Sequence, residues 1–393
     1  MNICIVVLGL GKSKGGGVIG GVNNVLNLAK GLVSNGHKID IMTTYPLYPD
    51  GNYTVDLPGA RIHYLTPHPF KGTRYSVAFT VKAVKKITEL HQKEHLDLVC
   101  GYSSYPALAL IPIIAGKINR LPKVHYLTSP IQRKTSLLFS FLKIYLSRID
   151  MIIPLTHNVR RSLENIVTGE KIHKPIPPSV DLSIFSPEVS GEKVRKALSL
   201  GENPTLFFLG NLTKTKGIEV LLAALEIVKR SVPNIKLLMG LDMPIEGYQS
   251  KPLKSREEIE SVNLEGHIIP LGILSNVAEV MTACDIFIAP FTSIEGIADY
   301  PISILEAMAS GKPVIASRIG GIPELLTHRE TGLLVKPGDV AELADSILYL
   351  LKQKEEAQKM ASWGAKCVQQ KFKPSIAVSE LEDALQNVLE RRN

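Results

Sequence analysis

Residues 298–316 read ADYPISILEAMASGKPVIA, and they contain a helix that leads directly into a short apolar strand. Pro301 suits the first turn of a helix, where the missing N–H of proline costs nothing. The helix is expected near 303–309 and the strand at 314–316. A helix followed at once by a buried strand is typical of a doubly wound α/β sheet.

Glu306 lies inside this otherwise apolar helix. A carboxylate without a partner among apolar side chains is costly, so Glu306 must find a partner. The ribose diol of a nucleotide and an internal arginine serve equally well on composition alone.

Short apolar runs and longer helical patterns alternate on both sides of this segment, in two series. Strands of the first series are expected at 3–8, 39–43, 96–100, 124–127 and 151–154, with helices that include 22–32 and 76–90. Strands of the second are expected at 206–209, 236–239, 268–270, 286–289 and 314–316, with helices that include 217–230, 276–282 and 340–351. This alternation predicts parallel sheets covered on both faces. The fold class is therefore α/β, with two Rossmann-like doubly wound domains.

A proline-rich stretch separates the two series. Residues 174–178 read KPIPP, and the stretch continues to Pro187. We therefore expect one domain at 1–185 and a second at 186–373. The C-terminal segment 374–393 begins with a proline and contains a last helix, which is expected to pack back on the first domain.

Charge is divided unevenly along the chain. Residues 1–190 hold 22 Lys+Arg against 11 Asp+Glu (net +11), and the rest hold 23 against 26 (net −3), which gives the +8 of the whole chain. The basic first half predicts that this part of the chain contacts an anionic partner. No nucleic-acid-binding motif accompanies the charge and only 6% of residues are aromatic. An anionic membrane surface or a phosphate-bearing lipid fits at least as well as nucleic acid, and we expect no nucleic-acid partner.

Cysteine usage and apolar runs indicate the compartment. The four cysteines are far apart and lie mostly in apolar runs, which is typical of buried thiols in a reducing environment. The first residues, MNICIVVLGL, have no basic leader, and the apolar runs fall short of the ~20 residues of a membrane helix. We expect a cytoplasmic protein.

The basic, apolar segment 131–148 is expected to be either a core helix or a surface that lies on the cytoplasmic face of the membrane.

Two more strand-to-helix loops carry glycine and lysine. The loop at 9–21, GLGKSKGGGVIGG, fits neither a Walker A loop nor a dinucleotide fingerprint. We expect phosphate or substrate contact at Gly20 and Gly21, against the alternative of a plain surface loop. The loop at 209–217, LGNLTKTKG, places Lys216 before a helix, where it either neutralises a diphosphate or is merely solvated.

Taken together, these segments resemble glycosyltransferase family 4 over nearly the whole chain and in the family's order. The similar segments are GG at 20–21 with GHKI at 36–39, IPPSVD at 176–181 with FSP at 185–187, 210–217, and, most specifically, LEAMASGKPV at 305–314 with GGIPE at 320–324. The resemblance implies the GT-B fold, with two domains facing a cleft. It also implies a retaining, metal-independent transfer of a sugar from a UDP-, GDP- or similar donor to a hydroxyl of a glycan or glycolipid.

The resemblance implies roles for individual residues. Lys216 and the backbone near Gly21 would contact the donor diphosphate, and Glu306 would bind the ribose. The catalytic residues implied are Lys216, Glu306, Asp299 and Ser129. The donor contacts implied are Gly20, Gly21, Gly210, Asn211, Lys216, Gly272, Ile273, Glu295, Ile302, Ser303 and Glu306. No metal and no separate cofactor are implied, and no Asp-x-Asp pair is present.

Two departures from the family pattern concern catalytic groups. The first of the family's two glutamates falls on Ala298, so that Glu295 or Asp299 would have to supply its carboxylate. The histidine usual after the fifth strand is replaced near Ser129. His125 lies within the expected strand, and we expect it to be structural.

A third departure removes a charge, because the arginine usual beside the phosphate glycine is Asn211. Lys214 or Lys12 would compensate. The departures leave two alternatives to a glycosyltransferase. One is a pseudoenzyme that binds a sugar nucleotide without turnover. The other is a sugar-nucleotide epimerase of the same architecture, whose set of carboxylates and histidine is not found here.

Overall fold

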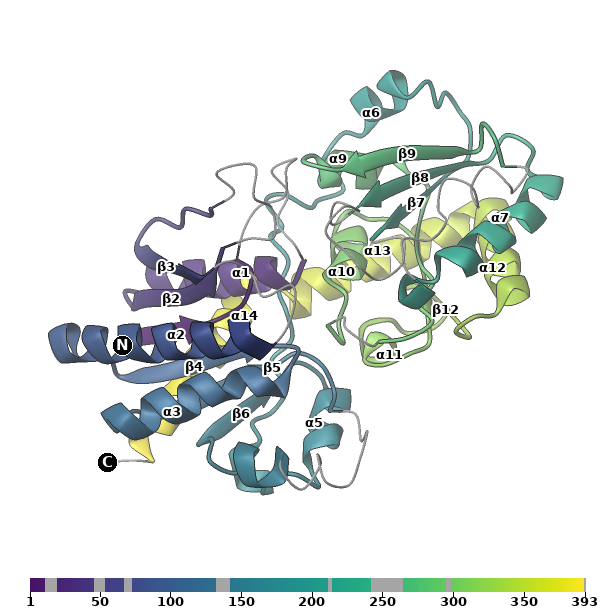
Figure 1. Ribbon diagram of the computed structural model, residues 1–393. Helices are drawn as coiled ribbons and strands as arrows, with labels where there is room; N and C mark the ends of the chain where they lie inside the picture. Colours follow the sequence, from purple (N-terminus) through teal and green to yellow (C-terminus); the bar gives the residue numbers. More distant parts are fainter. Residues whose placement is uncertain are drawn as a thin grey trace.

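The computed structural model describes residues 1–10, 20–45, 54–66, 73–131, 142–210, 214–241, 264–294 and 298–391, with the backbone alone at 20–22, 73–76 and 241. Figure 1 shows two lobes, the N-terminal one in purple and blue and the C-terminal one in teal to yellow-green. Each lobe contains a six-stranded sheet. In the described ranges no helix is both long and apolar enough to cross a membrane.

The sheet of the N-terminal lobe has the order β3-β2-β1-β4-β5-β6, and all its neighbouring strands are parallel. Its strands are β1 (Asn2–Val6), β2 (Lys38–Thr44), β3 (Ala60–Thr66), β4 (Leu98–Ser103), β5 (Lys123–Leu127) and β6 (Met151–Pro154). Its helices are α1 (Gly20–Ser34), α2 (Thr73–Glu94), α3 (Leu110–Asn119) and α5 (His157–Leu163), with 3-10 turns η1 (Pro106–Ala109) and η2 (Gly169–Lys171).

The sheet of the C-terminal lobe has the order β12-β11-β10-β7-β8-β9 and is also parallel. Its strands are β7 (Thr205–Leu209), β8 (Lys236–Leu241), β9 (Ile268–Ile273), β10 (Ile286–Ala289), β11 (Val314–Ser317) and β12 (Leu333–Val335). Its helices are α6 (Glu192–Ala197), α7 (Ile218–Ser231), α9 (Val277–Ala283), α10 (Ile302–Ala309), α11 (Ile322–Leu325), α12 (Val340–Lys352) and α13 (Lys354–Lys371), with the turn η3 (Lys214–Lys216).

The central strands are buried on both faces, which explains their nearly continuous apolar sequences. All four residues of β10 and all four of β11 are buried, and so are all but the first residue of β1. Two parallel six-stranded sheets covered by helices confirm the predicted α/β class with two Rossmann-like domains.

Two strands were not predicted, and both lie at an edge of a sheet. β3 reads ARIHYLT and is mostly half-buried, so it lacks the apolar run of a central strand. β12 is only three residues long. Edge strands are short or partly polar, and their sequence signal is correspondingly weak.

The C-terminal helix α14 (Pro374–Glu390) packs against α1 of the N-terminal lobe. Glu382 on α14 accepts hydrogen bonds from Asn35 at 2.8 Å and pairs with His37 at 2.6 Å. Gly31 allows this packing, because a Cβ at that position would lie 2.3 Å from a methyl group of Val378. The end of the chain is thus fixed to the lobe in which the chain begins (Figure 1).

Candidate functional site

The two lobes meet where strands of both sheets end. Thr128 follows β5, and its carbonyl accepts a hydrogen bond from the backbone N–H of Asp299, which comes after β10, at 2.9 Å. Thr156 follows β6, and its hydroxyl donates to the Asp299 carboxylate at 2.5 Å. Because ligands of doubly wound sheets bind beyond the carboxyl ends of the strands, this junction is the candidate functional site.

Glu306 lies in the middle of α10 and is only 6% exposed. Burial alone raises the pKa of its carboxyl to about 7. Among the described residues, no arginine or other side chain pairs with it. The sequence allowed two partners for Glu306, an internal arginine or the ribose diol of a nucleotide. Because no arginine of the described residues pairs with it, the diol of a ligand is the partner left.

Lys216 is the last residue of η3, just after β7. Its Nζ lies 4.8 Å from the centre of the Phe291 ring, and its stem runs past Gly210, where a Cβ would be 3.4 Å from Lys216 Cδ. Phe291 follows β10, and Thr292 in turn donates a backbone hydrogen bond to the carbonyl of Thr215. The lysine is thus held between the ends of two adjacent strands of the C-terminal sheet.

Gly217 is the N-cap of helix α7 and has a φ of +73°. A Cβ at this position would lie 1.8 Å from the carbonyl oxygen of Pro290. Only glycine satisfies both the left-handed backbone and this close approach. Gly217 therefore fixes the backbone directly after Lys216 against the end of β10.

The remaining C-lobe positions predicted from the sequence lie at strand and helix ends. Gly272 and Ile273 end β9, and Gly272 has a φ of +65° with open space around its Cα. Ile302 and Ser303 form the first turn of α10, whose N–H groups lack partners within the helix. Such helix ends accept anions.

Asp299 is fully buried, and several donors surround its carboxylate. Besides the Thr156 hydroxyl, the Asn158 side-chain amide lies 3.1 and 3.2 Å from its two oxygens, and the backbone of Gly321 also donates to it. Burial raises the pKa of Asp299. The carboxylate of Asp299 is thus bound by donors from both lobes.

Sequence reasoning did not single out Thr156 and Asn158, which hold Asp299 from the other lobe. Thr156 is the N-cap of α5, and its side chain accepts from Val159 N. A threonine before a helical run was the only available signal, and it says nothing about a partner in a distant segment.

Ser129 and His125 belong to the β5 side of the junction. Ser129 is two residues beyond the strand and is 8% exposed. His125 lies inside β5 and is completely buried. Its Nε2 is 3.4 Å from the Ser103 hydroxyl, and its Nδ1 has no hydrogen-bond partner among the described residues. Burial lowers the pKa of His125 to about 3, so the ring is neutral.

Some of the predicted positions fall outside the described residues, and others lie away from the junction. Asn211, Glu295 and Lys12 lie outside the described residues. Gly20 and Gly21 form the backbone of the first turn of α1. Lys214, the suggested replacement for the missing arginine, is 82% exposed and lies 3.4 Å from Glu219.

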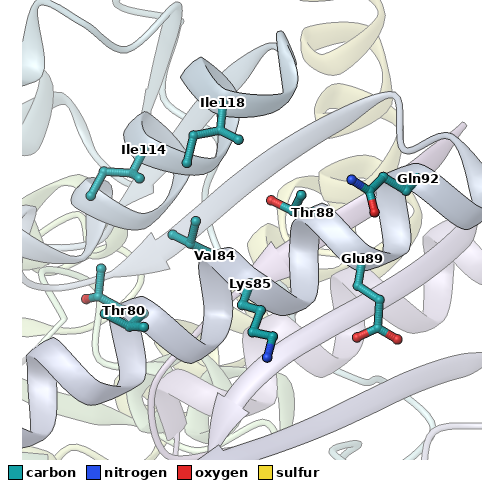
Figure 2. A pocket seen from close by; sticks show the side chains of 9 residues that line it. Thr80, Val84, Lys85, Thr88, Glu89, Gln92, Ile114 and Ile118 are labelled. Atoms are coloured by element: carbon teal, nitrogen blue, oxygen red, sulfur yellow. The ribbon is translucent and has the colours of Figure 1, made fainter.

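A separate hollow lies on the surface of the N-terminal lobe, between α2 and α3. In Figure 2, Ile114 and Ile118 on α3 face the groove together with Val84 and Thr80 on α2. None of the residues predicted from the sequence to form the site lines this groove. Its complete lining is Thr80, Val81, Val84, Lys85, Thr88, Glu89, Gln92, Ile114 and Ile118.

Comparison with known proteins gives similar sequences and folds. Over 381 residues the chain is 24% identical to N-acetyl-alpha-D-glucosaminyl L-malate synthase of Bacillus anthracis, which covers 95% of this chain and 94% of that protein. Over 217 residues it is 30% identical to a GDP-mannose-dependent alpha-(1-6)-phosphatidylinositol monomannoside mannosyltransferase of Mycobacterium tuberculosis, covering 53% and 54%. The crystal structure of Anabaena Alr3699/HepE in complex with UDP and glucose superposes with a TM-score of 0.78 at 20% identity, over 98% and 99% of the two chains.

Two family models match adjoining parts of the chain. Residues 19–184 match the model described as Glycosyltransferase Family 4, and residues 190–366 match Glycosyl transferases group 1. The sucrose-phosphate synthase structure from Thermosynechococcus elongatus shares the fold over the whole of both chains, with a TM-score of 0.82 at 20% identity. The chain therefore belongs to glycosyltransferase family 4, of the group 1 type, and is a glycosyltransferase with the GT-B fold.

Proposed function

We propose that this glycosyltransferase moves a sugar from a nucleoside-diphosphate donor to a hydroxyl of a glycan or glycolipid, with retention of configuration and without a metal or other cofactor. The observation that carries the proposal is Glu306, a buried carboxyl in helix α10 of the C-terminal lobe without a partner among the described residues. A ribose diol supplies two O–H donors to one carboxylate and offsets the cost of its burial.

Lys216 and the first turn of α10 supply the positive end of the site. In the proposed reaction the glycosidic bond to the diphosphate breaks, and negative charge develops on the departing phosphate oxygen. Lys216 and the N–H groups at Ile302 and Ser303 stabilise that charge by fixed geometry. The acceptor oxygen attacks from the same face, and the leaving phosphate takes its proton, which retains the configuration.

Metal-independent transfer is a further part of the proposal, and it rests on fixed positive charge. In the proposed site a lysine and helix N-termini take the role that a divalent cation plays elsewhere in phosphate chemistry.

A lipid-linked acceptor and a place at the cytoplasmic membrane face are part of the proposal. The M. tuberculosis relative is named for a phosphatidylinositol monomannoside acceptor. The Escherichia coli relative, 25% identical over 288 residues, is named for a diphosphoundecaprenol acceptor. The expected membrane segment, 131–148, is described only at residue 131 and from 142 onward. In that described part Ile144 is 62% exposed.

Assaying transfer tests the proposal and separates it from its alternatives. Radiolabelled UDP-, GDP-, ADP- and TDP-sugars are incubated with a bacterial lipid extract and with soluble glycans, in excess chelator. The proposal predicts a labelled product from one donor, and NMR of its anomeric proton should show retained configuration. Isomerised donor without transfer would indicate an epimerase. Donor binding with neither product nor hydrolysis would indicate a pseudoenzyme, and an inverted product would contradict retention.

Membrane attachment is tested separately by sedimentation with vesicles of phosphatidylcholine, with and without phosphatidylglycerol. We expect binding only to the anionic vesicles, and weaker binding in Ile144→Asp than in the wild type. Glu355→Asp, on an exposed part of α13, is the matched control. Equal binding to both kinds of vesicle, or none to either, would contradict the membrane proposal.

A further inference from the structure

The N-terminus of α5 receives its hydrogen-bond acceptors from both lobes. The first N–H groups of any helix lack partners within the helix. Here the Thr156 hydroxyl accepts from Val159 N at 2.8 Å. The two preceding amides, of His157 and Asn158, each donate at 2.9 Å to the Glu324 carboxylate, which belongs to α11 of the C-terminal lobe.

A second carboxylate of the C-terminal lobe lies at the same place. Asp299 accepts from the Thr156 hydroxyl at 2.5 Å and from the Asn158 amide at 3.1 Å. The hydroxyl of Tyr300, next in sequence, donates to Glu324 at 3.0 Å. Negative charge at a helix N-terminus is favourable, and charge-assisted hydrogen bonds are the strong ones. The capping of α5 is therefore complete only when the lobes are together.

Two glycines make room for this contact. A Cβ at Gly320 would lie 2.5 Å from one oxygen of Asp299, and a Cβ at Gly321 would lie 2.7 Å from the other and 2.9 Å from the Thr156 methyl group. A side chain at Gly320 would displace the Asp299 carboxylate, and one at Gly321 would in addition collide with Thr156 of the other lobe. Gly320, Gly321 and Glu324 thus belong to one structural unit.

We propose that Asp299 and Glu324, bound to the N-terminus of α5, form an interlobe latch that holds the loop 299–303 in place at the start of α10. In this assignment Asp299 is a positioning residue that faces the other lobe and does not contact the donor. The effect of Asp299 on donor binding rests on the proposed function, because that function places the donor's phosphate and sugar at this loop. The latch itself does not depend on the proposed function.

Hydrogen exchange of the full-length protein without ligand tests the latch directly, read at the amides of His157 and Asn158. Asp299→Asn keeps the shape but removes the charge, and we expect about a tenfold loss of protection at these amides, as for a lost charge-assisted hydrogen bond. Amides of β1 and β7 should keep their protection, which a general loss of stability would not allow. Wild-type protection at His157 and Asn158 in Asp299→Asn would overturn the proposal.

Variants on the other lobe make the test independent of one substitution. Thr156→Val removes the hydroxyl, whereas Thr156→Ser keeps it and is the matched control. The latch predicts that Thr156→Val lowers the exchange protection of the Asn158 amide and that Thr156→Ser does not. In the double variant Thr156→Val with Asp299→Asn, the loss of protection should be no greater than the larger of the two single losses. Strictly additive losses would show that the two residues act separately and would overturn the latch.

A titration with UDP, GDP, ADP and TDP then connects the latch to the donor. We expect a weaker affinity in Asp299→Asn, because the loop 299–303 is no longer held where it contacts the donor. Opening of the lobes adds to this loss only by the factor by which the closed fraction falls. Lost protection with unchanged affinity would overturn the positioning role of Asp299 while leaving the latch. Failure of every nucleotide to bind the wild type would overturn the proposed function instead, and the exchange result would stand.

Discussion

Asp299 and Glu306 are carboxyl groups from one short segment, and both are buried, but their surroundings differ completely. Asp299 accepts hydrogen bonds from Thr156, Asn158 and Gly321. Glu306 lies seven residues further along the chain. Its carboxyl accepts no hydrogen bond from a described residue, and burial raises its pKa to about 7. Burial alone thus does not identify a ligand site. The informative feature is a buried polar group that has no partner among the described residues.

This difference makes Glu306 costly for the folded protein. At a pKa of about 7 in the folded protein against 4.5 unperturbed, the ionised group lowers the free energy of unfolding by about 3 kcal/mol. The folded pKa is the higher one, so the penalty is absent below pH 4.5, grows as the pH rises, and is complete above pH 7. Asp299 also has a raised pKa, but its donors limit the effect.

The largest effect is predicted for Glu306→Gln. At pH 8 the variant should be more stable than the wild type by up to about 3 kcal/mol, and at pH 4 the two should be alike. Urea unfolding at both pH values measures this difference. A variant that is less stable than the wild type at pH 8 would show that the carboxylate has a stabilising partner in the protein.

The second prediction concerns nucleotide-sugar affinity. The ribose hydroxyls need the ionised carboxylate, so affinity should fall about tenfold for each pH unit below 7 and be constant above it. Calorimetry between pH 5.5 and 8.5 should use UDP-glucose or GDP-mannose, whose diphosphates do not titrate in this range. A flat profile would contradict the assignment of Glu306 to the ribose.

The third prediction compares two lysines of one loop. Lys216→Ala should weaken UDP or GDP binding by about tenfold or more, and the loss should shrink for the nucleoside without phosphates. Lys214→Ala is the matched control, because this lysine is 82% exposed and pairs with Glu219, and it should change affinity less than twofold. Equal effects of the two would mean that Lys216 acts only through general charge.

The smallest effect is predicted for Tyr300→Phe. It removes one donor from Glu324, which keeps its two backbone donors, so the free energy of unfolding should fall by about 1 kcal/mol or less. Urea unfolding measures it. A loss of several kcal/mol would show that the hydrogen bonds of the Glu324 carboxylate depend on one another and cannot be removed singly.

The sequence allowed the prediction of features that depend on nearby residues. The apolar runs of β1, β10 and β11 predicted buried parallel strands, and the carboxylate inside an apolar helix predicted the unusual position of Glu306. The contacts of Asp299 could not be predicted, because Thr156 and Asn158 lie in a distant segment and no periodicity joins them. β3 and β12 were missed for the opposite reason, since partly exposed or very short edge strands lack a clear local pattern.

The central claim is that the carboxyl of Glu306 in the C-terminal lobe binds the ribose of a nucleotide. Titration of the wild type and Glu306→Gln at pH 8 with UDP, GDP, ADP and TDP tests it most directly. We predict tight binding of one nucleotide to the wild type, and an affinity at least about 100-fold lower in the variant, because two hydrogen bonds to a charged group are weakened. A folded variant that binds that nucleotide as tightly as the wild type would contradict the account.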